Sequence, residues 1–142
     1  HITGEEPVEI TASAEVGPPQ VDLMLEAEMV FPSGIKARTS GDMREGVGFK
    51  AVLEVIGSKG QMTVNNPLVP QNGHGIAVKV GSDSRVETRD RRPTYGYQLD
   101  AFIAAVEEGA PMLTGPEDAI NQMRAIDRCY EAAGLPVRGL EL

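Results

Sequence analysis

The residues best suited to binding chemistry lie together in Thr94-Tyr95-Gly96-Tyr97-Gln98, which offers two phenols, an amide and a glycine where a helix is predicted to begin. The first turn of a helix leaves backbone N–H groups unpaired, and tyrosine and glutamine side chains can hydrogen-bond a polyol. Tyr95, Tyr97 and Gln98 are therefore the candidate substrate-binding residues. A structural interpretation, which residue type alone favours, is that the tyrosines cover the edge of the core and Gln98 is solvated.

Three arginines, Arg89, Arg91 and Arg92, precede this segment with Asp90 among them. A solvated loop is the simpler interpretation, and an anion contact at the rim of a pocket is the alternative. The formal net charge of −8 argues against nucleic-acid binding, which draws on a surplus of lysine and arginine.

The motifs of the common catalytic classes are absent from the sequence. Neither Gly46-Val47-Gly48 nor Gly73-His74-Gly75 has the third glycine and the following helix of a dinucleotide-binding loop, and no His-Glu-x-x-His is present. With only His1 and His74, a histidine-based metal cage is not expected, and His74, between two glycines, is expected to be exposed. The acidic residues alternate along strands as a solvated face does, so no glycosidase-like carboxylate pair is singled out. We therefore predict no catalytic, cofactor-binding or metal-binding residue within the chain itself.

Cys129 is the single cysteine and cannot form an internal disulfide, which fits a reducing cytoplasm. No activating group lies near it in sequence, so a buried structural thiol is favoured over a nucleophile. No apolar run approaches the roughly 18 residues of a membrane span and no signal peptide is visible, which predicts a cytoplasmic protein without membrane contact. The chain begins at His1-Ile2-Thr3-Gly4, which resembles the end of a preceding helix and indicates a fragment.

Alternation of apolar and polar residues predicts strands in the first two thirds of the chain. The even positions from Val8 to Val16 and the odd positions from Val21 to Phe31 are all apolar. Further strands are predicted over Ile35–Ser40, Phe49–Ile56, Gln61–Val64, Ile76–Val80 and Ser84–Arg89, so that strands occupy about residues 7–89. The turns between them are short, as at Ser58-Lys59-Gly60, and parallel strands would need long crossovers. The sheet is therefore predicted to be largely antiparallel.

Two helices are predicted after the strands, over about residues 95–108 and 115–133. One buried stripe is predicted on the first helix, and Gly109 ends that helix. The stripe consists of Leu99, Phe102, Ile103 and Val106. The second helix is predicted to open with a capping box of Thr114 and Glu117, with Pro116 in its first turn, and to end at Gly134. Its apolar face carries Ala119, Ile120, Met123, Ile126 and Tyr130.

The fold class follows from this order of elements. Strands first and paired helices last predict an α+β fold, an open, largely antiparallel β-sheet with two C-terminal helices packed on one face. The 142 residues are one domain's worth, and 41% hydrophobic and 24% charged residues are ordinary for a soluble globular protein.

Apolar residues also occur on the face opposite the predicted helices. Met24, Val30, Val52 and Ile56 lie among charged residues on that register. Several such residues on neighbouring strands would form a patch suited to a partner sheet, which predicts a homo-oligomer through the open sheet face. The alternative is that loops or strand twist cover them.

Several segments, taken in order, carry a family resemblance. They are Phe31-Pro32-Ser33-Gly34, Ile56-Gly57-Ser58-Lys59-Gly60, Thr94-Tyr95-Gly96-Tyr97-Gln98-Leu99, and Gly109 through Thr114-Gly115-Pro116-Glu117-Asp118-Ala119. With the order of the strands, they resemble the C-terminal domain of the Gfo/Idh/MocA oxidoreductases, within that family the dihydrodiol and sugar dehydrogenase branch. The resemblance covers the chain from about Gly4 to Gly139.

The resemblance implies the substrate-side and assembly domain of a two-domain oxidoreductase that transfers a hydride between NAD or NADP and a sugar, polyol or related diol. None of Lys36, Lys50, Lys59 and Lys79 lies in the Glu-Lys-Pro context of the family's catalytic lysine. The family's catalytic histidine would lie upstream of His1. This chain alone, without a catalytic half, is therefore expected to bind no cofactor and to be inactive. A stand-alone, non-catalytic binding or assembly module of the same fold is the alternative, and a small hydrolase has nothing specific to support it.

Overall fold

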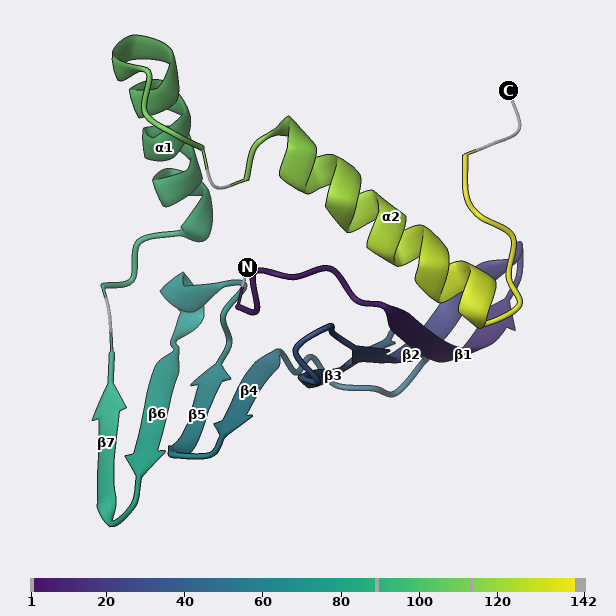
Figure 1. Ribbon diagram of the computed structural model, residues 1–142, viewed down its shortest axis with the longest axis horizontal. Coiled ribbons are helices and arrows are strands. Elements are labelled where there is room, and N and C mark those ends of the chain that lie inside the picture. Colours follow the sequence, from purple (N-terminus) through teal and green to yellow (C-terminus); the bar gives the residue numbers. More distant parts are fainter. Residues whose placement is uncertain (1, 89, 113, 140–142) are drawn as a thin grey trace. The chain divides into compact units, whose positions relative to one another are not determined.

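The computed structural model describes residues 2–88, 90–112 and 114–139 and divides the chain into two compact units (Figure 1). The first unit comprises residues 1–47 and 113–142, and the second comprises residues 48–112. Each unit carries one antiparallel sheet and one α-helix. The predicted α+β class and antiparallel pairing are therefore confirmed. The seven described strands lie in two open sheets, whereas the sequence predicted one.

The first unit is a three-stranded sheet in the order β1-β2-β3, with β1 at Glu9–Gly17, β2 at Val21–Val30 and β3 at Lys36–Asp42. The predicted alternation is present, since Ile10, Ala12 and Ala14 are half-buried while the polar residues between them are exposed. A bulge between Glu15 and Val16 then shifts the register by one residue, so that Val16 is 45% exposed. Beyond the bulge the predicted alternation no longer holds.

Helix α2 (Pro116–Ala132) packs against β1 in the first unit (Figure 1). The Arg128 guanidinium donates hydrogen bonds to the backbone oxygens of Pro7 and Val8, the latter over 3.1 Å. The Tyr130 hydroxyl donates to Asp22 Oδ1 over 2.7 Å. These contacts attach the C-terminal half of α2 to the sheet, while Ile120 and Met123 in its N-terminal half are 52% and 55% exposed.

The start of α2 differs from the predicted capping box. Gly115 is the N-cap, and no side chain makes a capping hydrogen bond. The residue before a proline is biased towards extended backbone, and Gly115, at φ −78° and ψ −176° before Pro116, has that conformation. The cap therefore falls one residue after Thr114, and the prediction that Thr114 and Glu117 form a capping box is wrong.

The second unit is a four-stranded sheet in the order β4-β5-β6-β7. Its strands are β4 (Val52–Gly57), β5 (Gly60–Asn65), β6 (Gly75–Val80) and β7 (Asp83–Glu87), with a short 3-10 helix η1 at Pro70–Asn72 between β5 and β6. Gly57 pairs with Gly60 across the turn at Ser58-Lys59, as the hairpin prediction requires. The predicted strand from Phe49 begins only at Val52.

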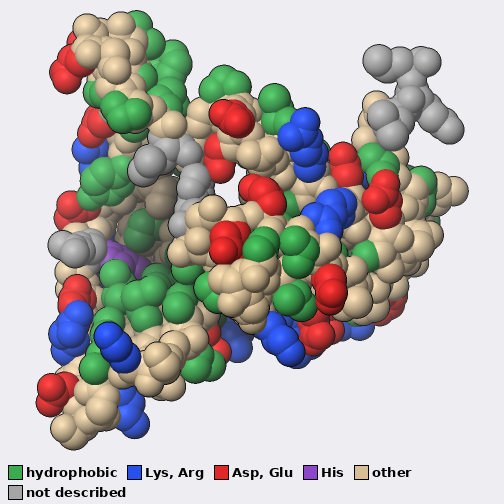
Figure 2. Space-filling view, viewed as in Figure 1, with side chains coloured by type: hydrophobic (Ala, Val, Ile, Leu, Met, Phe, Trp, Pro, Cys, Tyr) green, Lys and Arg blue, Asp and Glu red, His purple; other side chains and the backbone are tan. Residues whose placement is uncertain are grey.

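Helix α1 (Thr94–Glu108) follows β7 and ends at Gly109, whose φ of 68° is left-handed as predicted for a helix stop. Its apolar stripe is not buried within the second unit, because no described strand of that unit packs along α1. Leu99, Phe102, Ile103 and Val106 are 57%, 53%, 43% and 68% exposed, and Figure 2 shows hydrophobic side chains at the surface over this helix. The prediction that this stripe is buried is therefore wrong.

Gly60 is the glycine whose missing side chain matters most to the second sheet. A Cβ there would lie 2.1 Å from the Lys79 backbone oxygen, so Gly60→Ala forces β5 away from β6. We expect this variant to lower the free energy of unfolding by about 2 kcal/mol, measured by urea denaturation. Gly75→Ala is the matched control, since its Cβ meets nothing within 4 Å; equal losses in both variants would contradict the close approach.

Candidate functional site

The second unit contains a cavity of about 520 Å³ where β5 ends and β6 begins, beside η1 and the first turn of α1. Its wall combines four apolar side chains with five that carry polar groups. The lining residues are Val64, Asn66, Pro67, Pro70, His74, Ile76, Asp90, Arg92 and Tyr97. An apolar wall with a few convergent polar groups is the usual composition of a small-molecule site.

Tyr97 and Asp90 form the central polar pair of this cavity. The Tyr97 hydroxyl lies 2.7 Å from each oxygen of the Asp90 carboxylate and donates its proton to them, and the Arg92 backbone N–H donates to Asp90 Oδ1 over 2.9 Å. Both donors favour the ionised carboxylate, Tyr97 most strongly, so the pKa of Asp90 lies below its usual value. The same hydrogen bond raises the pKa of Tyr97, because a phenolate beside the carboxylate would lose it. At neutral pH the pair is a neutral phenol held by an anion.

Arg92 contributes a positive charge that is already paired. Its guanidinium donates to both oxygens of Asp100, over 2.6 and 2.9 Å, and to the Gly96 backbone oxygen over 2.9 Å. It also lies 4.9 Å from the centroid of the Tyr97 ring, a cation–π distance. A Cβ at Gly96 would lie 2.6 Å from Arg92 Nε, so the glycine in this helix turn leaves room for the guanidinium.

Asn66 and His74 shape the opposite side of the cavity. Asn66 Nδ2 donates to the backbone oxygens of Val69 and Gly73, over 2.9 and 2.7 Å, which fixes the loop around η1. Asn66 Oδ1 is buried and accepts no hydrogen bond from the described residues. His74 Nδ1 lies 3.2 Å from the Pro70 backbone oxygen, and the side chain is half-buried. The expectation that His74 is exposed is therefore wrong, because the 3-10 turn folds back over it.

Only one of the three predicted substrate-binding residues lines the cavity. Tyr97 lines the cavity, whereas Tyr95 is 81% exposed and Gln98 is exposed, and neither lines it. Of the arginine cluster, Arg92 lines the cavity, Arg91 does not, and Arg89 lies outside the described residues, as does His1.

The sequence reasoning did not select Asp90, Asn66 or His74 as site residues. For the charged loop around Asp90 the sequence predicts either solvation or an anion contact through its arginines, and nothing in the sequence indicates Asn66. The available signal was the spacing of seven residues between Asp90 and Tyr97, which lets a loop residue reach the first turn of the following helix.

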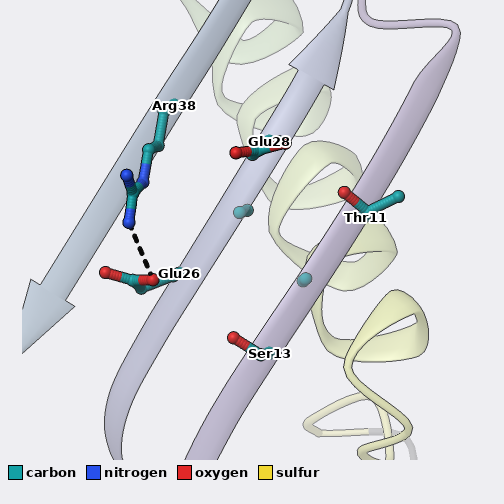
Figure 3. A pocket seen from close by; sticks show the side chains of 7 residues that line it. Thr11, Ser13, Glu26, Glu28 and Arg38 are labelled. Atoms are coloured by element: carbon teal, nitrogen blue, oxygen red, sulfur yellow. Dashed lines mark hydrogen bonds and ion pairs between the residues drawn. The ribbon is translucent and has the colours of Figure 1, made fainter.

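A second, smaller groove of about 240 Å³ lies on the open face of β1-β2-β3 (Figure 3). Thr11, Ser13, Glu26, Glu28 and Arg38 point from the three strands to the same side, and α2 lies on the other side of the sheet. Arg38 pairs with Glu26 over 3.0 Å, and Ser40 Oγ donates to Glu26 over 3.2 Å. The Arg38–Glu26 ion pair is exposed to solvent, as the alternating acidic pattern predicted for this face. The cavity around Tyr97 is therefore the stronger candidate.

Other chemistries have less support. Cys129 is 4% exposed, which confirms the structural prediction, and burial raises the pKa of its thiol and disfavours a reactive thiolate. Residues 2–88, 90–112 and 114–139 contain no group of three or more histidine, cysteine or acidic side chains that could hold a metal ion. Within that same part of the chain, no helix is long and apolar enough to cross a membrane.

Comparison with known proteins adds a family and a set of similar folds. The family model of the oxidoreductase family, C-terminal alpha/beta domain (Gfo/Idh/MocA), matches residues 3–137. No curated protein matches the chain. Among solved structures, aldose-aldose oxidoreductase from Caulobacter crescentus, complexed with glycerol, superposes with a TM-score of 0.80 at 23% identity, covering 94% of this chain and 41% of that one.

Two further oxidoreductases have similar folds. UDP-N-acetylglucosamine 3-dehydrogenase from Acidithiobacillus ferrooxidans gives a TM-score of 0.70 at 13% identity, covering 94% of this chain and 41% of that one. Biliverdin reductase from Synechocystis, in complex with biliverdin and NADP+, gives 0.70 at 17% identity, covering 90% of this chain and 40% of that one. At these identities the likeness is one of fold, and this chain spans about two fifths of each of these proteins.

The hydrogen bond between Tyr97 and Asp90 leads us to expect that replacing Asp90 changes the pKa of Tyr97. In Asp90→Asn the neighbouring charge is gone, so the pKa of Tyr97 should fall towards that of an ordinary tyrosine. NMR titration of labelled tyrosine rings measures this shift. Tyr130 is the internal control, because its raised pKa comes first from its hydrogen bond to Asp22 and should stay unchanged. An unaltered Tyr97 in the variant would show that Asp90 does not hold its proton.

Proposed function

Because this chain belongs to the Gfo/Idh/MocA oxidoreductase family as its C-terminal domain, we propose that it forms the substrate-side wall of an NAD(P)-dependent oxidoreductase acting on a sugar, polyol or related diol. The observation that carries this proposal is the cavity in which Tyr97, Asp90 and Arg92 meet Asn66 and His74. The nicotinamide cofactor accepts or supplies the hydride in such a reaction. The role of this chain is to bind and orient the alcohol.

The chemistry of the cavity supports a hydroxylated substrate. A tyrosine hydroxyl and a carboxylate both accept hydrogen bonds from alcohols, and apolar walls such as Val64, Pro67 and Ile76 suit the C–H faces of a sugar ring. The aldose-aldose oxidoreductase is named for a sugar substrate, which agrees with this class.

The sequence lacks a dinucleotide-binding glycine fingerprint, and the chain spans about 41% of the aldose-aldose oxidoreductase. We therefore assign cofactor binding and proton transfer to residues outside this chain. On this proposal the chain alone catalyses no hydride transfer.

Steady-state kinetics of the full-length protein that contains this chain test the proposal. It should reduce NAD or NADP with a sugar or polyol, and Tyr97→Phe should raise KM about tenfold, the loss expected for one ligand hydrogen bond. Tyr130→Phe is the matched control, since that hydroxyl also binds an aspartate but lies outside the cavity. No turnover of any sugar or polyol with either cofactor would contradict the function, and equal effects in both variants would contradict the site.

Tyr95 remains a predicted contact although it is exposed. Tyr95→Phe in the same full-length protein tests it separately, and an unchanged kcat/KM for the best substrate would remove Tyr95 from the site.

We also propose that the full-length protein forms a homo-oligomer through an open sheet face. Of the residues predicted for this patch, Met24 and Val30 belong to the first unit, where both are half-buried, and Val52 and Ile56 belong to the second. The pairing of the four strands places Val52 and Ile56 on the same face as Val86. Ile56 and Val86 are 80% and 73% exposed, which supports a contact surface.

Ile56→Glu should shift the full-length protein towards monomer, because a carboxylate replaces an apolar side chain in the proposed interface. Sedimentation velocity measures the change. Val80→Glu is the matched control, since Val80 is 48% exposed on the opposite face of the same sheet. A monomeric wild type, or dissociation by both variants, would contradict this interface.

A further inference from the structure

We propose that the cavity around Tyr97 selects neutral polyhydroxyl ligands over those that carry a carboxylate or phosphate, and that Asp90 is the specificity-determining residue. This inference rests on the proposed function and names the substrate class of the same site. Three features of the cavity carry it: the paired state of Arg92, the negative charge of Asp90 and the direction in which Tyr97 donates its proton.

The positively charged guanidinium of Arg92 is already paired with the Asp100 carboxylate. Of the described residues that line the cavity, only Arg92 carries a permanent positive charge. Its two terminal nitrogens bind both oxygens of Asp100, and one of them also binds the Gly96 backbone oxygen. Bidentate pairing of this kind is the strong geometry for an arginine–carboxylate contact. An anionic ligand would have to displace Asp100 to reach the guanidinium.

Asp90 leaves the cavity with an excess of negative charge. Arg92 balances the charge of Asp100, and Asp90 is the remaining carboxylate; hydrogen bonds lower the pKa of both carboxyl groups, so both are ionised at neutral pH, and His74 adds a small electrostatic attraction to Asp90. A carboxylate or phosphate on a ligand would therefore meet Asp90 as a like charge. A neutral polyol meets no such repulsion.

The hydrogen-bond direction favours a ligand rich in O–H donors. Tyr97 gives its single proton to Asp90, so the lone pairs on its oxygen can only accept from a ligand. A carboxylate offers about four acceptor sites, and Asp90 still has capacity beyond Tyr97 and the Arg92 N–H. Both groups therefore act as acceptors towards the ligand. Alcohol hydroxyls supply the complementary donors, whereas a carboxylate has none.

Calorimetric titration of the full-length protein with two matched pairs of probes tests this inference. Sorbitol is compared with gluconate, and glycerol with glycerate, because the members of each pair differ mainly in one carboxylate. We expect the neutral probe to bind at least about tenfold more tightly in each pair, which one like charge at close range supplies. In Asp90→Asn this ratio should fall by about tenfold through tighter binding of the anionic probes.

Asp83→Asn is the matched control, since it removes the same charge at the start of β7, outside the cavity. Its selectivity ratio should equal that of the wild type. A loss of fold would weaken both members of a pair together, so the ratio separates specificity from structural damage. The inference is overturned if the anionic probes bind as well as the neutral ones, or if Asp83→Asn changes the ratio as much as Asp90→Asn.

The two proposals fail in different ways. Turnover of gluconate or glycerate in preference to the neutral probes would leave an oxidoreductase of this family but overturn the selectivity. Absence of binding for all four probes would overturn the selectivity, whereas the proposed function fails only if no sugar or polyol is turned over with either cofactor.

Discussion

Backbone pairing between antiparallel neighbours is the interaction on which the described structure depends most. Within each sheet, every described strand pairs with the strands next to it in sequence, in the orders β1-β2-β3 and β4-β5-β6-β7. Few side chains are buried: among the described residues, these are Pro7, Ala27 and Cys129. The strand hydrogen bonds therefore fix where each loop begins, and the loops after β5 and β7 carry most of the cavity residues. The close approach of the Lys79 backbone oxygen to Gly60 is part of the same strand pairing, between β5 and β6.

This dependence explains what the sequence could predict of the fold. Pairing between strands that are neighbours in sequence can be predicted from local patterns. Apolar and polar residues alternate along each strand, and each turn contains glycine or polar residues. All seven described strands and both helices were predicted, with ends displaced by a few residues. The division into two sheets was not, since alternation within β3 and β4 does not reveal whether those two strands pair. The apolar stripe on α1 likewise shows that a face exists and not what covers it.

The candidate site was predicted in part for a similar reason. Tyr97 has a residue type suited to binding at a helix start, so it could be named from the sequence alone. Asp90 could not be named from the sequence, because its hydrogen bond with Tyr97, seven residues later, forms only where the loop leads into α1. His74 was misplaced because its flanking glycines suggested an open loop, whereas Asn66 holds that loop closed through two backbone oxygens. Such closure depends on a side chain that is not adjacent in sequence.

The structure contains the tyrosine–aspartate pair twice, and the contrast separates stability from binding. Tyr130 and Asp22 are 108 residues apart and join α2 to the sheet, so their hydrogen bond contributes to tertiary structure. Tyr97 and Asp90 are seven residues apart at the edge of a cavity, and both are exposed to solvent. A local hydrogen bond between exposed groups adds little to stability, because the unfolded chain gives up little entropy there and water competes. Replacing Asp90 therefore changes the charge and hydrogen-bond direction of the cavity while leaving the fold in place, which makes the residue a direct probe of what the cavity binds.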